Sequence, residues 1–133
     1  MIATIAKHFT FDAAHFLPLV PADHKCHRMH GHTYEVEIIV TGPIVNGFVV
    51  DYEDIATAWA QISDLVDHRV LNEIPGLENP STENLIAWMF QRIMLGWDQS
   101  LDTLRNNLSA IRIKESSTTW CEISARNWLA GRR

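Results

Sequence analysis

The stretch HGHTYEVEIIVTG, residues 30–42, decides the fold of this chain. After His32 it is rich in β-branched and aromatic residues that alternate in character, which predicts a strand entered at or just before His30. Residues two apart on a strand point to the same face, and Gly31 leaves the opposite face without a side chain. The strand therefore presents His30 and His32 together on one face.

A third histidine, His15, ends the preceding apolar pattern. It follows IAKHFTFDAA, residues 5–14, in which Ile5, Phe9 and Phe11 indicate a first strand. A hairpin with a long loop over residues 16–29 would carry His15 across to the pair on the second strand. The three imidazoles are then expected to converge.

Three converging histidines are typical of an open metal site. Three nitrogen ligands leave a fourth position free for a substrate, whereas four protein ligands usually close the shell and make the metal structural. Zinc suits imidazole best, although copper, nickel and iron also accept it. Two alternatives stay open: Cys26 as a fourth ligand of a closed site, and His24 in place of one histidine. We interpret His8 and His27 as ordinary histidines.

Composition limits the remaining possibilities. With 133 residues and 47% apolar content, the chain fits one globular domain spanning residues 1–133. Two cysteines are too few for a disulfide framework, and neither a signal peptide nor a membrane-spanning stretch is recognisable, so we expect a cytoplasmic protein. The net charge of −5, with no basic cluster longer than Arg132 and Arg133, argues against a nucleic-acid partner.

The rest of the chain predicts two helices and a second hairpin. Residues 51–66 place Ile55, Trp59, Ile62 and Val66 on one helical face, and residues 81–95 form a second helix capped by Asn79 or Ser81. Residues 108–115 and 118–124 read as two strands. The predicted fold class is α+β: a four-stranded antiparallel sheet with two helices on one face, in the order hairpin, helix, helix, hairpin.

Two parts of this prediction concern the surface. Apolar residues on both faces of the second strand, at residues 38–40, suggest that an oligomer buries the free face of the sheet. The segment 94–107 and the C-terminal tail match no expected role; the tail is expected to be disordered or to pack Trp128 and Leu129 on a neighbour.

Three further features contain side chains that could take part in catalysis. Cys26 lies among Lys25, His27 and Arg28, and cationic neighbours favour the thiolate, which can act as a base or a nucleophile. Asp67 and His68 form an adjacent pair in which the carboxylate could orient the imidazole for proton transfer. Glu115 ends the third predicted strand beside Lys114, where the alternative is an ordinary strand-end carboxylate in water.

Taken in order, these motifs resemble a known family. FDAAH at 11–15, CHRMHGH at 26–32, DH at 67–68, PGLENPSTEN at 75–84 and KE at 114–115 are similar to the 6-pyruvoyltetrahydropterin synthase and 6-carboxytetrahydropterin synthase family. The resemblance spans nearly the whole chain. It implies the tunnelling fold, in which three subunits form a twelve-stranded barrel and two trimers stack into a homohexamer.

The resemblance also implies roles for single residues. His15, His30 and His32 would hold Zn²⁺, and Cys26 would be the base that moves protons along the side chain of 7,8-dihydroneopterin triphosphate. Asp67 and His68 would form a proton relay that also serves triphosphate departure. Glu115 would bind the 2-amino and N3 edge of the pterin.

The interval between the cysteine and HGH resembles the carboxy-forming branch of the queuosine and 7-deazapurine route. The expected products are 6-carboxy-5,6,7,8-tetrahydropterin, acetaldehyde and triphosphate, formed with water as co-substrate. A pyruvoyl-forming enzyme and a non-catalytic zinc- or pterin-binding module are the alternatives. The candidates for meeting the triphosphate are Lys25, Arg28, Arg69, Arg112 and Lys114.

Overall fold

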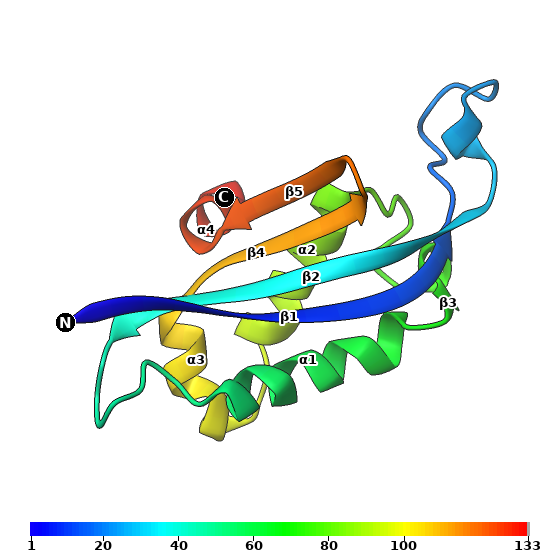
Figure 1. Ribbon diagram of the computed structural model, residues 1–133. Helices are drawn as coiled ribbons and strands as arrows, with labels where there is room; N and C mark the ends of the chain where they lie inside the picture. The colour runs from blue at the N-terminus through cyan, green and yellow to red at the C-terminus, as the bar shows by residue number, and fades with distance from the viewer. Residues whose placement is uncertain (133) are drawn as a thin grey trace.

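The computed structural model describes residues 1–132, so Arg133 of the terminal arginine pair lies outside the described residues. Short 3-10 turns occur at Lys25–His27, Leu71–Glu73 and Gln99–Leu101. The strands and helices, drawn in Figure 1, are β1 (Ile2–His15), β2 (His30–Pro43), α1 (Tyr52–Val66), β3 (Arg69–Val70), α2 (Thr82–Met94), α3 (Asp102–Asn107), β4 (Leu108–Ser116), β5 (Thr119–Ser124) and α4 (Ala125–Gly131). The predicted order of hairpin, helix, helix and hairpin is confirmed.

The antiparallel pair β1–β2 is the longest feature of the sheet. It pairs continuously from Ile2 opposite Pro43 to His15 opposite His30, and residues 16–29 form the loop between them. Alternation along both strands turns one face inward, so Phe11, Tyr34 and Val36 are buried. The three predicted histidines belong to this inner face because they continue the same alternation.

Helices α1 and α2 cover the inner face of the sheet (Figure 1). Asp51 caps α1 by accepting from the backbone N–H of Glu53, and Ser81 caps α2 by accepting from that of Asn84. The predicted stripe of α1 is buried: Ile55, Trp59, Ile62 and Val66. Their burial against the strands supplies the apolar driving force for this layer.

The sheet contains a fifth strand that the sequence did not reveal. Its order is β3-β1-β2-β4-β5, and the two-residue β3 pairs parallel with β1 at Ala13 and Ala14. The predicted four-stranded antiparallel sheet is therefore corrected to a mixed five-stranded one. A two-residue strand carries no hydrophobic period, which explains why the sequence pattern missed it.

Two unassigned segments are also structured. The segment 94–107 contains a 3-10 turn and α3, and the tail forms α4. Trp128 of α4 is buried and stacks on Phe90 of α2, with ring centroids 5.4 Å apart, whereas Leu129 is exposed. The expectation of a disordered or neighbour-packed tail is thus wrong for Trp128, which packs within its own chain.

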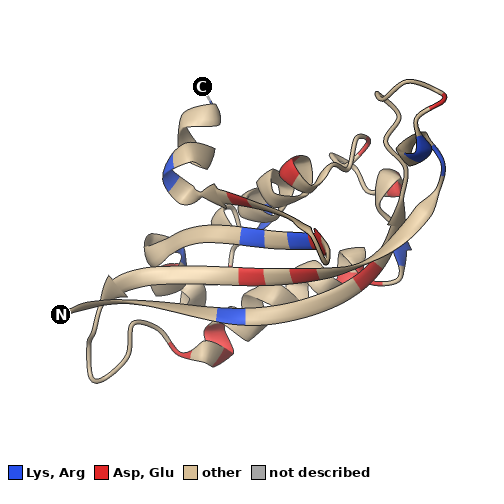
Figure 2. Ribbon diagram, turned by 45° about the horizontal axis from the view of Figure 1, so that its top comes forward, with Lys and Arg blue, Asp and Glu red and all other residues tan. Residues whose placement is uncertain are grey.

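The outer face of the sheet is charged. Figure 2 shows acidic positions along β2 beside basic positions on β4. Lys114 pairs with Glu35 at 3.7 Å, and the Arg112 guanidinium lies 3.9 Å from the ring centroid of Trp120 on β5. Ile39 is the partly buried apolar exception on this face of β2.

Within residues 1–132, no helix combines the length and apolar character that a membrane crossing requires.

The packing of α4 gives a direct test of the fold. Trp128→Ala should lower the free energy of unfolding by about 3 kcal/mol, because a buried, stacked indole is lost. Trp97→Ala is the matched control, since Trp97 is 96% exposed and its loss should change stability by less than about 0.5 kcal/mol. Urea denaturation at fixed protein concentration measures both, and equal effects would contradict the packing of α4.

Candidate metal centre and active site

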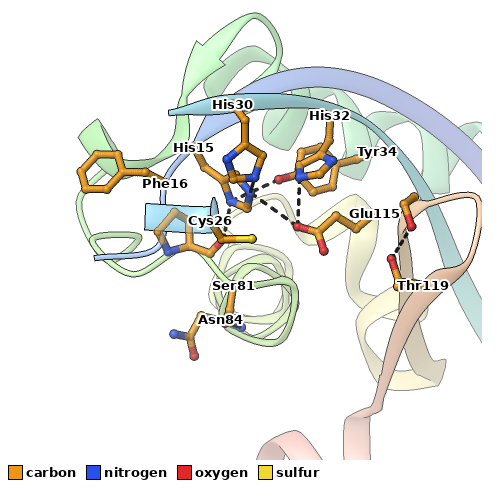
Figure 3. A network of polar contacts seen from close by, with 12 residues as sticks. His15, Phe16, Cys26, His30, His32, Tyr34, Ser81, Asn84, Glu115 and Thr119 are labelled. Carbon is orange, nitrogen blue, oxygen red and sulfur yellow. Dashed lines mark hydrogen bonds and ion pairs between the residues drawn. The ribbon is translucent and has the colours of Figure 1, made fainter. Parts of the chain in front are cut away.

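His15, His30 and His32 converge at the end of the β1–β2 hairpin. Each offers one ring nitrogen, and these three atoms lie within 4.8 Å of one another. The Nε2 atoms of His15 and His30 are 3.0 Å apart because the two residues are register partners on adjacent strands. Figure 3 shows the three rings directed at a common point. The convergence predicted from the sequence is present in the structure.

Backbone carbonyls fix the tautomers of two of these histidines. Nδ1 of His15 donates to the carbonyl oxygen of Pro80 at 2.9 Å, and Nδ1 of His30 donates to that of Arg28 at 2.7 Å. A carbonyl can only accept, so each Nδ1 carries the hydrogen and each Nε2 presents a lone pair. Such partners usually orient metal-binding imidazoles.

Two facing lone pairs repel each other unless a cation lies between them. A tetrahedral zinc ion with Zn–N bonds of 2.0–2.1 Å separates its ligand nitrogens by about 3.3 Å. The observed separation of 3.0 Å is close to that value. The donor set and its tautomers therefore fit a divalent metal.

Burial favours the neutral form of His15 and His32. His15 is 1% exposed, and desolvation lowers its pKa; desolvation also lowers the pKa of His32. Neutral imidazole is the form that binds metals. Tyr34, also buried, directs its hydroxyl to within 3.4 Å of His15 Nδ1, and desolvation raises the pKa of its phenol.

Glu115 lies beside the cluster. Its Oε1 is 3.4 Å from Nε2 of His32 and 3.5 Å from Nε2 of His15. A register shift between Lys114 and Ser116 in the β4–β5 pair leaves Glu115 without a cross-strand partner, and such bulges commonly re-aim a side chain. The carboxylate can therefore reach either the metal position or a ligand bound next to it.

Cys26 lies in the loop before β2. The loop is closed by a hydrogen bond from the backbone N–H of Leu17 to the carbonyl of Cys26 at 2.7 Å. In Figure 3 the thiol points in the direction of the Glu115 carboxylate. Among the described residues, neither Cys26 nor His24 belongs to the three-histidine group, so the geometry favours an open site over a closed four-ligand one.

Asp67 and His68 form a contact but lie apart from the histidine cluster. Nδ1 of His68 is 3.0 Å from Oδ1 of Asp67, and the same oxygen accepts from the backbone N–H of Asp12 at 3.1 Å. That bond from Asp12, followed by the contact with His68, lowers the pKa of Asp67. His68 is 77% exposed and adopts a φ of 58°, held by its own N–H bond to the carbonyl of Asp12.

Strand alternation places this dyad on the other side of the sheet. Asp12 and Thr33 share a hydrogen bond and project from the outer face, whereas His15 and His32 project from the inner one. A hollow of about 540 Å³ is lined by Asp12, Thr33 and His68 and also by His32, whose ring projects from the inner face. Within one chain, the three histidines and the Asp67–His68 pair therefore lie on different sides of the sheet.

The five basic residues named in the sequence analysis lie in three places: the Cys26 loop, the position after His68, and the outer face of the sheet. Lys25 and Arg28 lie in the loop with Cys26, and Arg69 follows His68. Arg112 and Lys114 are engaged on the outer face with Trp120 and Glu35.

Sequence reasoning missed several residues that build the site. Pro80 and Arg28 contribute carbonyl oxygens, which every residue type possesses, so no sequence signal marks them. Asp12 was visible in the FDAAH motif, but only the structure shows that it holds Asp67. Tyr34 lies two residues after His32 on the same face of β2, and this spacing could have identified it.

Comparisons with known proteins agree with this geometry. The family profile described as 6-pyruvoyl tetrahydropterin synthase matches residues 4–126. A dihydroneopterin monophosphate aldolase of Pyrococcus furiosus is 36% identical over 93 residues, covering 70% of this chain and 76% of that protein. A 6-carboxy-5,6,7,8-tetrahydropterin synthase of Synechocystis sp. is 33% identical over 96 residues, covering 67% of this chain and 73% of that protein.

Among solved structures, the 6-pyruvoyl tetrahydropterin synthase of Caenorhabditis elegans superposes with a TM-score of 0.82. It is 23% identical, and the match covers 94% of this chain and 96% of that one. The chain belongs to the 6-pyruvoyl tetrahydropterin synthase family. It is thus an enzyme, a lyase of this family, and the resemblance inferred from its motifs is confirmed.

The burial of His15 predicts a pH dependence of stability. Its pKa is lowered from 6.5 on folding, so below pH 6.5 the unfolded chain binds more protons than the folded one. The free energy of unfolding of metal-free protein should therefore fall as the pH decreases below about 7. His15→Gln should make this fall shallower in urea titrations.

The control is His8→Gln, because His8 is exposed and its replacement should leave the slope unchanged. A slope that is the same in the wild type and in His15→Gln would contradict the assignment of a buried neutral imidazole.

Proposed function

We propose that the chain converts 7,8-dihydroneopterin triphosphate and water to 6-carboxy-5,6,7,8-tetrahydropterin, acetaldehyde and triphosphate, in the queuosine and 7-deazapurine route. The observation that carries the proposal is the three-histidine cluster with its lone pairs aimed at one point. Several relatives named as 6-carboxy-5,6,7,8-tetrahydropterin synthases support the choice of branch.

His15, His30 and His32 would hold the metal, which we propose to be Zn²⁺. When bound, zinc would act as a Lewis acid toward oxygens of the substrate side chain and make the carbons that carry them more acidic. Burial lowers the pKa of His15 and of His32, which favours the neutral, metal-binding form. The Nδ1 bonds to Pro80 and Arg28 keep the rings in place.

The remaining residues would move protons and bind the pterin. Cys26 would act as a base and take a proton from the substrate side chain. Asp67 would orient His68 through Nδ1, which leaves Nε2 free to exchange a proton. Glu115 would accept two parallel N–H hydrogen bonds from the pterin edge. Its carboxylate already lies 3.5 Å from His15 and 3.4 Å from His32, so a pterin bound to it would lie beside the metal ligands.

We propose that a complete site needs two copies of the chain. His15, His30 and His32 form one cluster and Cys26 lies in the loop before β2, while Asp67 and His68 are bound to Asp12, which projects from the outer face of the sheet. A neighbouring copy could bring its exposed His68 to the histidine cluster of the first. This requirement supports the proposed homohexamer, a dimer of trimers.

Two other reactions are open to the same residues. A pyruvoyl-forming enzyme would share the early proton shifts and triphosphate loss. One relative, 36% identical over 93 residues, is named a dihydroneopterin monophosphate aldolase. By retro-aldol chemistry, an aldolase would break the side chain between its first two carbons and leave a hydroxymethyl pterin. A non-catalytic binding module would need Glu115 and the metal, but neither Cys26 nor the Asp67–His68 dyad.

Mass spectrometry of the products separates these possibilities. Zinc-loaded protein incubated with 7,8-dihydroneopterin triphosphate should give the 6-carboxytetrahydropterin mass together with acetaldehyde. A 6-pyruvoyltetrahydropterin mass, or a hydroxymethyl pterin with a two-carbon aldehyde, would move the chain to the corresponding alternative. Unchanged substrate with metal-bound protein would contradict catalysis altogether.

Mixed oligomers test whether the site is shared between copies. Cys26→Ala and His68→Ala should each lose activity, because each removes one proton-transfer group. After unfolding and refolding together, an equal mixture should recover about a quarter of wild-type activity, since random assembly restores that share of intact sites. Recovery of none would mean that all these residues act within one chain. Cys26→Ala should still bind zinc, which serves as its folding control.

A further inference from the structure

We propose that Asn72 is a positioning residue for the metal ligand His15. Its side-chain amide joins the backbone next to this histidine to the segment that holds the imidazole ring. The proposal rests on the proposed metal site and adds a residue that supports it from outside the ligand set.

Asn72 clamps the residue that follows His15. Its Oδ1 accepts from the backbone N–H of Phe16 at 3.0 Å, and its Nδ2 donates to the carbonyl oxygen of Phe16 at 2.8 Å. The β1–β2 pairing ends at His15 and His30, so Phe16 is the first residue beyond that ladder. The amide thus supplies both hydrogen bonds that a neighbouring strand would otherwise exchange with Phe16.

The same amide reaches the segment that orients the ring. Nδ2 also lies 3.4 Å from the carbonyl oxygen of Glu78, two residues before Pro80, whose carbonyl accepts from Nδ1 of His15. One side chain therefore spans from the backbone after the ligand to the chain that fixes its tautomer. Residues 72–80 act in this way as an outer support for the metal site.

This segment has its own anchors, so it should keep its shape without Asn72. Leu77 is fully buried, Gly76 takes a φ of 91° while its N–H donates to Glu78, and Asn84 donates to the carbonyl of Asn79 at 2.9 Å. Loss of the amide should loosen the link between His15 and Pro80 more than the fold itself.

The experiment measures zinc affinity with the metal alone, by competition against a chelating dye. Asn72→Ala should weaken zinc binding by about 10- to 100-fold, the range seen when outer partners of metal ligands are removed. Asn72→Asp keeps the shape and the acceptor but loses the donor, and it places a carboxylate oxygen against two carbonyls. It should weaken binding at least as much, which shows that the donated bonds and not the volume matter.

Two control variants separate positioning from general destabilisation. Asn106→Ala makes the same change at an exposed site on α3. Ile62→Val loses about 1 kcal/mol of core packing on α1, at a residue outside the histidine cluster. Both should bind zinc as tightly as the wild type.

A spectroscopic readout follows the hydrogen bond directly. In zinc-loaded protein, the Nδ1 proton of His15 should exchange with water at least about 10-fold faster in Asn72→Ala than in the wild type, because its acceptor is less well held. The Nδ1 proton of His30 is the internal comparison: its acceptor, Arg28, lies outside residues 72–80, so its exchange should change less than that of His15.

The outcomes are distinct. Asn72 variants that bind zinc within twofold of the wild type, with unchanged exchange at His15, would overturn the positioning role and leave the metal site intact. Wild-type protein that binds no zinc at the three histidines would overturn the proposed metal function, and the role of Asn72 with it.

Discussion

The structure depends on the register of β1 against β2. A continuous pairing from Ile2 opposite Pro43 to His15 opposite His30 sets which side chains face the helices and which face outward. A slip of one residue would move the histidines and Phe11, Tyr34 and Val36 to the other face together, because strand side chains alternate. Burial of the apolar row therefore fixes the geometry of the metal centre as a consequence of folding.

The same alternation places the candidate catalytic residues on two faces of the sheet. Residues of odd number at the end of β1 turn toward the helices, while Asp12 turns outward and holds the exposed pair Asp67 and His68. Under our proposal a second copy brings the two groups together, and the charged outer face, with acidic β2 beside basic β4, suits contact with other polar surfaces (Figure 2). Oligomerisation is then part of the proposed catalysis and not only a source of stability.

Local patterns predicted much of the fold and the centre of the site. The period of two in residues 30–42, the stripe of α1 and the cap of α2 at Ser81, one of two predicted candidates, are all properties of neighbouring residues, and each was predicted. Features that arise from contacts distant in the sequence were missed. β3 exists because Ala13 and Ala14 offer it an edge, α4 is held by Phe90, and the tautomer of His15 depends on a carbonyl 65 residues away. None of these leaves a periodic trace in the sequence.

The central claim is an open metal site with three histidine ligands and a free position. X-ray absorption at the zinc edge of the metal-loaded protein tests it most directly. We predict a first shell of three imidazole nitrogens at about 2.0–2.1 Å and one oxygen, with no sulfur. A sulfur neighbour at about 2.3 Å would mean that Cys26 closes the shell, and it would contradict both the open site and the role of Cys26 as a base.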